Sequence, residues 1–346
     1  MGSDHRRHGH LDRAAHPLPA RHAAAVHRKP HRRRGEGMTG NAQKGIMNAH
    51  LSGMIPPVVS PLTDAHRADV AAVERLAAHV IGGGAGGVFV LGSCGEGPTL
   101  EPDVARAITR AYVDAVAGAV PVLAGVGETS TERAVRAAAE YEQLGVDALV
   151  VMAPMYFDAE TDGAVIRHAT AIAAATSLPL VVYNIPHLTH HPITPRALRE
   201  LAAIDAVVAL KESSGNWDIY SALAQTARAA GLRVFQGAEA LIGRSLLAGA
   251  DGAVPGIANV VPDLATALVR AGLSGDGAQV STLQARLDEV CTLYRSGFWL
   301  TSLKSALAEL GITGGTAGAA LPPLDAGGSD EVRRVLTTLG LLGAPA

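Results

Sequence analysis

The fold is indicated most clearly by residues 148–183, which read ALVVMAPMYFDAETDGAVIRHATAIAAATSLPLVVY. The stretch begins and ends with short runs rich in β-branched residues, at Ala148–Met152 and Leu180–Tyr183. Between them, residues 163–175 carry apolar side chains at helical spacing. This order predicts a strand, a covering helix and a second strand parallel to the first.

The same unit repeats along most of the chain. Ala-rich amphipathic stretches, for example residues 103–116, 131–144 and 217–230, separate the β-type runs. Eight such units in order predict an α/β fold of the (β/α)8 TIM barrel type. A doubly wound sheet shares the alternation, but eight units over roughly 220 residues without a break in composition favour closure. The expected strands are Ile55–Ser60, Gly87–Leu91, Val120–Gly125, Ala148–Met152, Leu180–Tyr183, Val207–Lys211, Arg233–Gln236 and Gly252–Val254.

The chain divides into three predicted parts. Residues 50–271 form the barrel, and residues 272–346 form a C-terminal helical extension, because strand signals stop after Ala271 and only helical patterns follow, at 279–294, 299–310 and 330–341. Residues 1–49 mix Arg, His, Pro, Gly and Ala without apolar periodicity, which predicts a disordered basic, His-rich leader. A tag-like leader or a start codon assigned too early is favoured over a nucleic-acid-binding arm or a metal-binding His tract.

The charges are distributed unevenly. The whole chain has 29 Lys+Arg and 32 Asp+Glu, but residues 1–50 hold ten of the basic and three of the acidic groups. The remainder therefore has 19 basic and 29 acidic groups, a net charge of −10, which disfavours nucleic acid or an anionic membrane as a partner. No membrane span or signal peptide is indicated. Two distant cysteines, Cys94 and Cys291, predict a reducing, cytoplasmic setting.

The sequence context does not support a motif for nucleotide binding, metal binding or serine hydrolysis. Residues 82–87 fit the G-x-G-x-x-G pattern, yet they follow a helix and precede a strand, which is the reverse of the dinucleotide-binding context. His187, His190 and His191 lie in a segment bracketed by prolines, where helical metal-ligand spacing does not apply. No G-x-S-x-G elbow is present. We therefore expect neither a cofactor nor a metal.

Reactive groups of a TIM barrel lie where the strands end, on the loops that follow them. Only two of the 19 basic groups in the predicted folded part are lysines, Lys211 and Lys304. Lys211 ends the apolar run Val207–Leu210, where burial would favour the neutral amine that attacks carbonyl carbons. An equally weighted alternative is a lysine that only extends to solvent or pairs with Glu212. Four such strand-end stretches stand out: residues 92–96 (GSCGE), 154–156 (PMY), 183–186 (YNIP) and 211–216 (KESSGN).

Two further strand-end groups suit the same chemistry. Tyr183 ends the strand before that of Lys211, so its phenol could transfer protons there, or it could be an ordinary core tyrosine. Residues 92–95 offer small residues, backbone N–H groups and a hydroxyl, which suit a carboxylate, although a plain turn has the same composition.

Together and in order, these stretches resemble the dihydrodipicolinate synthase and N-acetylneuraminate lyase family of class I Schiff-base aldolases, over roughly residues 54–341. GSCGE is similar to the family's G-[ST]-T-G-E, YNIP to Y-N-x-P, and KESSG to K-x-[AST]-[ST]-G. The resemblance implies a TIM barrel with a C-terminal helical extension, and a homotetramer built as a dimer of dimers. It also implies small-molecule partners, a 2-oxo acid and an aldehyde, without a cofactor.

The resemblance also assigns roles to residues. Lys211 would form an imine with pyruvate or another 2-oxo acid, and Tyr183 would shuttle the proton. Ser93 would link Tyr183 to Tyr156, which would reach in from a partner subunit. Ser93 and Cys94 would hold the carboxylate of the 2-oxo acid, and the carbonyl of Val254 would line the imine pocket.

The sequence departs from the family pattern at several positions. Cys94 replaces a threonine, and Leu188 stands where dihydrodipicolinate synthases usually have an arginine that holds the carboxylate of the aldehyde. Loss of such a contact costs about 2 to 3 kcal/mol, and the Y-N-I-P-x-L segment is closer to the lyase branch. Enzymes of that branch have two acidic residues and a serine in the sugar pocket. This chain keeps one acidic residue, Glu239, and has Gly256 in place of the serine. Glu239 and Thr189 are candidate contacts for hydroxyls of the aldehyde.

We therefore expect a Schiff-base aldolase or lyase that condenses pyruvate or a related 2-oxo acid with an aldehyde, or cleaves the product. The alternatives within this class are a 4-hydroxy-tetrahydrodipicolinate synthase, an N-acetylneuraminate lyase and a 2-oxo-3-deoxy sugar acid aldolase or dehydratase. A homologue that binds 2-oxo acids without catalysis is the alternative from another class.

Overall fold

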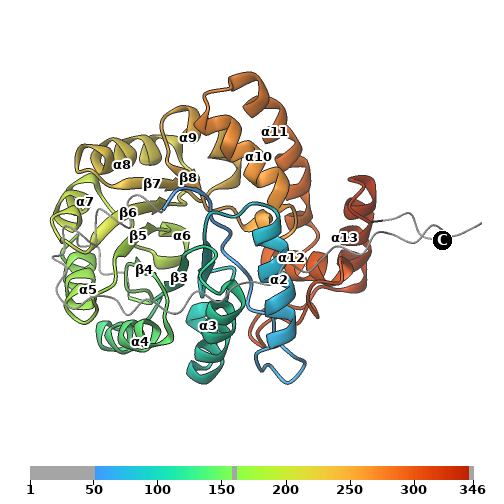
Figure 1. Ribbon diagram of the computed structural model, residues 1–346, viewed down its shortest axis with the longest axis horizontal. Coiled ribbons are helices and arrows are strands. Elements are labelled where there is room, and N and C mark those ends of the chain that lie inside the picture. Colours follow the sequence, from blue (N-terminus) through green and yellow to red (C-terminus); the bar gives the residue numbers. More distant parts are fainter. Residues whose placement is uncertain (1–50, 158–161, 343–346) are drawn as a thin grey trace, which may run out of the picture. The chain divides into compact units, whose positions relative to one another are not determined.

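The computed structural model describes residues 51–157 and 162–342, all of which fall in one compact unit (Figure 1). The leader predicted at residues 1–49 lies outside the described residues. Within the described ranges, every helix is too short or too polar to cross a membrane.

Eight parallel strands form the centre of the protein, and Figure 1 shows helices around them. Strands β2 to β8 pair with one another in chain order, and β8 also pairs with β1. The chain after β1 contacts β2, because Val58 N donates to Phe89 O (2.9 Å) and Phe89 N donates to Pro56 O (3.0 Å). These bonds close the ring, so the predicted (β/α)8 barrel is confirmed. The strands are β1 (Gly53–Met54), β2 (Val88–Val90), β3 (Val122–Gly125), β4 (Ala148–Met152), β5 (Leu180–Asn184), β6 (Val207–Glu212), β7 (Arg233–Gln236) and β8 (Gly252–Ala253).

The first strand was predicted wrongly. The expected run was Ile55–Ser60, but the regular ladder covers only Gly53–Met54. Pro56 and Pro57 lack the N–H groups that a ladder requires, so regular pairing ends before them. A Cβ on Gly252 would lie 2.1 Å from Gly53 O, so β8 approaches β1 this closely because it has glycine there.

The predicted helical stretches form helices with ends shifted by a few residues. Several begin at side-chain caps: Ser130 Oγ accepts from Arg133 N (3.3 Å), and Asn216 Oδ1 accepts from Asp218 N (2.9 Å). The barrel helices are α2 (Val70–Gly82), α3 (Pro102–Val116), α4 (Thr131–Leu144), α5 (Asp162–Ala174), α6 (Pro186–Thr189), α7 (Pro195–Ala202), α8 (Trp217–Ala229), α9 (Ile242–Leu247) and α10 (Pro262–Leu273). The later helices are α11 (Gly277–Val290), α12 (Trp299–Glu309) and α13 (Ala326–Thr338). Short 3-10 turns are η1 (Gly97–Thr99), η2 (Glu239–Leu241), η3 (Gly256–Asn259) and η4 (Cys291–Arg295).

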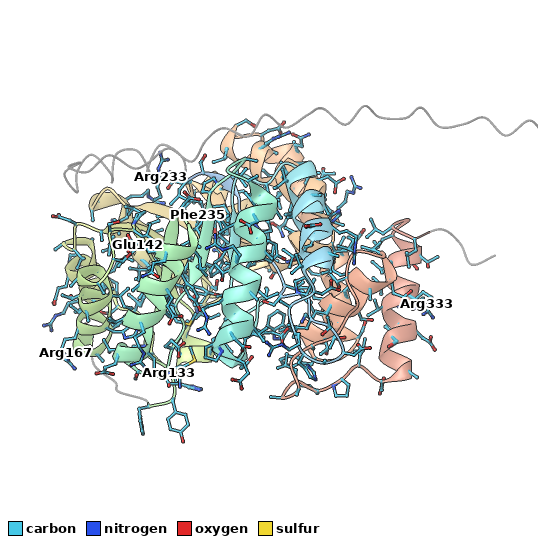
Figure 2. The ribbon with its side chains drawn as sticks, turned by 60° about the horizontal axis from the view of Figure 1, so that its bottom comes forward. Arg133, Glu142, Arg167, Arg233, Phe235 and Arg333 are labelled. Carbon is cyan, nitrogen blue, oxygen red and sulfur yellow. The ribbon has the colours of Figure 1, made fainter. Side chains whose placement is uncertain are left out.

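Apolar side chains fill two layers. One lies between the strands and the surrounding helices, and the other fills the inside of the barrel. In Figure 2, Phe235 lies among the strands, whereas Arg167 and Arg333 lie at the periphery. The helical extension packs on one side, with α11 against α10 and α12 against η3 (Figure 1). Its first elements therefore lie next to the loops that follow β7 and β8.

A buried ion pair joins the extension to the barrel. Lys304 of α12 donates to Glu96, which follows β2, and both side chains are 1% exposed. Glu96 Oε2 also accepts from Gly318 N (2.6 Å), and Lys304 Nζ donates to Thr316 O (2.7 Å). Burial lowers the pKa of Lys304, and the charge of Glu96 opposes this shift. Each charge therefore depends on the other to stay in the interior.

Replacing Lys304 with Met should lower the free energy of unfolding by about 3 to 5 kcal/mol, because Glu96 would stay buried without its partner. Urea unfolding measures this change. The double variant Glu96→Gln, Lys304→Met removes both charges and keeps the acceptor for Gly318 N, so it should recover most of the loss. Wild-type stability of the single variant would contradict the importance of the pair.

A buried histidine makes stability depend on pH. His168 of α5 is 1% exposed, its Nδ1 lies 3.0 Å from Thr131 Oγ1, and its Nε2 has no hydrogen-bond partner among the described residues. Burial lowers its pKa to about 4, against the smaller opposing effect of Glu132. Because this value is below that of the unfolded chain, the neutral form stabilises the fold above about pH 6.5, and this contribution is lost as the pH falls toward 4.

The variant His168→Gln should therefore lose less stability than the wild type between pH 7 and pH 4, by about 2 to 3 kcal/mol. Chemical unfolding at a series of pH values measures this difference. The exposed His187→Gln is the matched control and should follow the wild type. Parallel curves for wild type and His168→Gln would contradict the assignment.

Candidate active site

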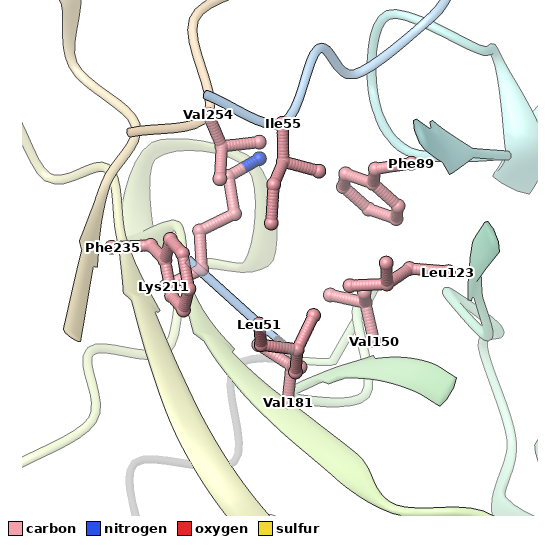
Figure 3. Close-up of a pocket in the computed structure, with 9 residues that line it drawn as sticks. All are labelled: Leu51, Ile55, Phe89, Leu123, Val150, Val181, Lys211, Phe235 and Val254. Carbon is pink, nitrogen blue, oxygen red and sulfur yellow. The ribbon is translucent and has the colours of Figure 1, made fainter. Parts of the chain in front are cut away.

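Lys211 lies inside the barrel. It is the penultimate residue of β6, is 4% exposed, and stands in register with Tyr183 of β5 and Phe235 of β7. Figure 3 shows its amine near Val254 and Ile55. No ion pair involves this lysine within residues 51–157 and 162–342. Apart from Lys211, the cavity around it is lined by Leu51, Ile55, Phe89, Leu123, Val150, Val181, Phe235 and Val254.

Tyr183 lies directly beside this amine. Its ring centroid is 3.9 Å from Lys211 Nζ, and that of Phe89 is 4.8 Å away. The rings of Tyr183 and Phe89 meet edge to face, with centroids 6.4 Å apart. Two residues that the sequence singled out are thus brought together, because neighbouring parallel strands place equivalent positions side by side.

Glu212 does not pair with Lys211, although the two are adjacent in sequence. Successive side chains of a strand point to opposite faces, so Glu212 points out of the barrel. It is fully buried, and its Oε1 accepts from Asn184 Nδ2 (3.0 Å) and Ser214 N (2.8 Å). Asn184 Oδ1 in turn accepts from Ile193 N (2.9 Å), which fixes the loop after β5. The sequence motifs did not predict the pair of Asn184 and Glu212, although these two polar residues end the neighbouring apolar strands β5 and β6.

The loop after β2 is held in an unusual backbone conformation. Leu91 and Glu96 both have positive φ, 55° and 56°. Ser60 Oγ donates to Gly95 O (2.6 Å), and a Cβ on Gly97 would lie 2.1 Å from Leu91 O. Together with the ion pair of Glu96, these contacts fix the loop that carries Ser93 and Cys94.

Cys94 carries a neutral thiol. It is 8% exposed, and burial raises its pKa to about 12, with the charge of Lys211 acting against this and that of Glu239 in the same direction. A thiol with this pKa is not a nucleophile near neutral pH. It can act only as a weak hydrogen-bond donor or acceptor.

A polar corner adjoins Cys94. Glu239 Oε1 accepts from Tyr294 Oη (2.9 Å) and from Ile257 N (3.2 Å). A Cβ on Gly256 would lie 3.1 Å from Tyr294 Oη and 3.2 Å from Cys94 Sγ. Sequence analysis identified Glu239 but missed Tyr294, because no barrel motif extends into the helical extension.

The other site residues predicted from the sequence differ in their burial and in their contacts. Val254 is 5% exposed and contacts the lysine cavity. Thr189 is 1% exposed and its hydroxyl is within hydrogen-bond distance of Ile185 O (3.1 Å) and His191 O (3.2 Å), so it bonds to its own loop. Tyr156 is 79% exposed, has φ 95° and packs on Phe157. No hydrogen bond joins Ser93 to Tyr183 in the part of the chain that the structure describes.

Metal-ligating residues do not gather in this site. Across residues 51–157 and 162–342, no group of three or more His, Cys, Asp or Glu side chains is arranged to hold a metal ion.

Comparisons with known proteins agree with this architecture. The model of the dihydrodipicolinate synthetase family matches residues 50–339. An uncharacterized DapA-like lyase of Halobacterium salinarum is 34% identical over 295 residues, which cover 84% of this chain and 95% of that protein. A 4-hydroxy-tetrahydrodipicolinate synthase of Cyanothece sp. is 31% identical over 293 residues, covering 84% of this chain and 98% of that protein.

Solved structures are similar over the same region. YagE of E. coli K12, a member of the dihydrodipicolinic acid synthase family in complex with pyruvate, has a TM-score of 0.80 and 27% identity, covering 84% of this chain and 99% of that one. Dihydrodipicolinate synthase of Thermotoga maritima has a TM-score of 0.81 and 26% identity, covering 85% and 100%. Because the family model spans nearly all described residues and relatives above 30% identity align over almost their full length, this chain belongs to the dihydrodipicolinate synthetase family of lyases.

Proposed function

We propose that the protein is a Schiff-base aldolase or lyase that needs no cofactor and whose nucleophile is Lys211. The observation that carries this proposal is the position of the amine, which is buried in an apolar cavity with Tyr183 at 3.9 Å and without a carboxylate partner among the described residues. Pyruvate is the proposed first substrate, and the pyruvate complex of the similar YagE supports this choice. An amine without an ion-pair partner at the end of a barrel strand can act as the nucleophile that attacks a carbonyl carbon.

The proposed reaction balances without an oxidant or reductant. Lys211 Nζ attacks C2 of pyruvate, and loss of one water gives a protonated imine. A proton leaves C3 to give an enamine, and Tyr183 is the group that carries this proton. The enamine carbon then bonds to the aldehyde carbon, whose oxygen takes up a proton, and water releases the product from Lys211. The lyase direction reverses each step.

Substrate contacts follow from the loops around the lysine. Ser93, Cys94 and the backbone N–H groups of their loop are proposed to hold the carboxylate of the 2-oxo acid. The carbonyl of Val254 is proposed to line the imine pocket. Glu239 is the proposed contact on the aldehyde side, and Thr189 is a weaker candidate because its hydroxyl already contacts backbone carbonyls.

A second copy of the chain is proposed to complete the proton relay. Tyr156 is the candidate, because its side chain is 79% exposed and contacts only Phe157 among the described aromatic rings. In a homotetramer made of two dimers, Tyr156 of one subunit would reach Ser93 and Tyr183 of the other.

A cytoplasmic location is also proposed, in keeping with the free thiols of Cys94 and Cys291.

The aldehyde is proposed to differ from that of 4-hydroxy-tetrahydrodipicolinate synthases. Leu188 is 42% exposed on α6 and offers no charge to a carboxylate. The relatives that carry the synthase name favour that activity as the second candidate. An N-acetylneuraminate lyase and a 2-oxo-3-deoxy sugar acid aldolase or dehydratase are the other candidates within the class.

Reduction with borohydride in the presence of pyruvate should attach one reduced pyruvate to the protein at Lys211. Peptide mass spectrometry locates the adduct, and the lysines that could compete with Lys211 are Lys29, Lys44 and Lys304. The variant Lys211→Met keeps the volume of the side chain and should form no adduct. An adduct on another lysine, or none with any 2-oxo acid, would contradict the proposal, whereas an adduct without turnover of any aldehyde would favour a non-catalytic binding protein.

Replacing Tyr183 with Phe should lower kcat about 100- to 10,000-fold, because the proton carrier is lost while the ring contact with Lys211 remains. Steady-state rates measure the loss, and circular dichroism confirms the fold. Tyr220→Phe is a matched control, since that buried hydroxyl bonds Ser245 O (3.4 Å) outside the lysine cavity. A wild-type rate for Tyr183→Phe would exclude this residue as the proton carrier.

A further inference from the structure

Tyr294 brings a side chain of the helical extension to the edge of the active site. It lies in η4, and its ring packs edge to face on Trp299 with centroids 6.3 Å apart. Its hydroxyl donates to Glu239 Oε1 (2.9 Å). The extension also contacts this loop through α11, where Gln284 Nε2 donates to Glu239 O (3.0 Å) and Gln284 Oε1 accepts from Gly243 N (2.8 Å). The phenol and the carboxylate therefore have fixed positions.

The phenol occupies a place that a side chain from the barrel would otherwise fill. Gly256 follows β8, and a Cβ there would lie 3.1 Å from Tyr294 Oη, 3.2 Å from Cys94 Sγ and 3.3 Å from Glu239 Oε1. The absence of a side chain at Gly256 thus leaves room for the hydroxyl of Tyr294.

This corner is close to the reactive lysine. A Cβ on Gly237, two residues before Glu239, would lie 3.0 Å from Lys211 Cε. A Cβ on Gly256 would lie close to both Cys94 Sγ and Glu239 Oε1, and Val254, two residues earlier, lines the cavity of Lys211. Tyr294 and Glu239 therefore lie at the loops that border the lysine cavity after β7 and β8.

The hydrogen-bonding groups of Tyr294 and Glu239 indicate which chemical class of ligand fits this corner. The single proton of the Tyr294 hydroxyl is already donated to Glu239, so toward a ligand this oxygen can only accept. The carboxylate of Glu239 is also only an acceptor. Two acceptors require donors on the ligand, which hydroxyl groups supply and carboxylates or phosphates do not. The negative charge of Glu239 would repel an anionic aldehyde, and Leu188 supplies no opposing charge.

We propose that Tyr294, held by Glu239, is a specificity-determining residue that selects an uncharged polyhydroxy aldehyde as the partner of the 2-oxo acid. This inference rests on the proposed Schiff-base chemistry at Lys211. It assigns a direct part in substrate recognition to the C-terminal extension, and it names the chemical class of the substrate that the motifs leave open.

Condensation with pyruvate should be measured for five aldehydes. D-Erythrose and D-glyceraldehyde carry hydroxyls, propionaldehyde carries none, and glyoxylate and succinic semialdehyde are anionic. The wild type should prefer the hydroxylated aldehydes. Tyr294→Phe keeps the ring contact with Trp299 and should lower kcat/KM for D-erythrose about 10- to 100-fold, while the rate with propionaldehyde and the borohydride adduct at Lys211 stay unchanged.

Two further variants separate recognition from folding. Tyr112→Phe removes a buried phenol that donates to Val59 O (2.8 Å) and should leave the order of preference unchanged. Glu239→Gln removes the charge and adds a donor, so the preference for D-erythrose over succinic semialdehyde should fall at least about tenfold.

The outcomes distinguish the two proposals. Absence of a borohydride adduct in the wild type would overturn the Schiff-base chemistry itself. An adduct at Lys211 together with equal or faster turnover of succinic semialdehyde, or no turnover of either hydroxylated aldehyde, would overturn only the assignment of Tyr294 and its ligand class. An equal loss for all five aldehydes in Tyr294→Phe would likewise overturn it, because that pattern indicates a structural role.

Discussion

The ion pair between Glu96 and Lys304 is the interaction on which the arrangement of the site depends. Each charge is buried, so neither can remain in the interior without the other. The pair fixes the loop after β2 to α12 of the extension, and it holds Glu96 in a backbone conformation that non-glycine residues seldom adopt. The carboxylate-binding role proposed for Ser93 and Cys94 requires a loop that is fixed in this way. The helices beyond the barrel are therefore part of what shapes the site.

The strands and the extension make different contributions. Neighbouring strands β5 and β6 place Tyr183 beside Lys211 in an apolar interior. The extension supplies the polar and charged contacts at the rim, through Lys304 on one loop and Tyr294 on another. The proposed nucleophile and the proposed specificity-determining residue thus lie on different elements of the fold.

Local patterns in the sequence predicted much of this structure. The alternation of β-type runs and amphipathic stretches predicted the barrel, and motifs at strand ends predicted that Lys211 and Tyr183 lie together. The first strand was misplaced because apolar composition does not reveal the effect of Pro56 and Pro57 on the ladder.

Long-range partners could not be predicted in the same way. Lys304 and Glu96 are 208 residues apart, and nothing in the sequence near either residue identifies the other. Tyr294 lies in a short 3-10 turn without a motif, so its contact with Glu239 became visible only in the folded chain.

The closure of the barrel has a consequence for its motions. Beside the closing contact between β1 and β2, the paired strands β1 and β8 have only two residues each, whereas β5 and β6 have five and six. Few ladder bonds must break to separate β1 from β8, so local opening there costs less free energy than between β5 and β6. Val254 directly follows β8 and contacts the cavity of Lys211. One of the shortest ladders of the barrel therefore lies beside the cavity of Lys211, and local opening of this ladder would loosen the wall of that cavity.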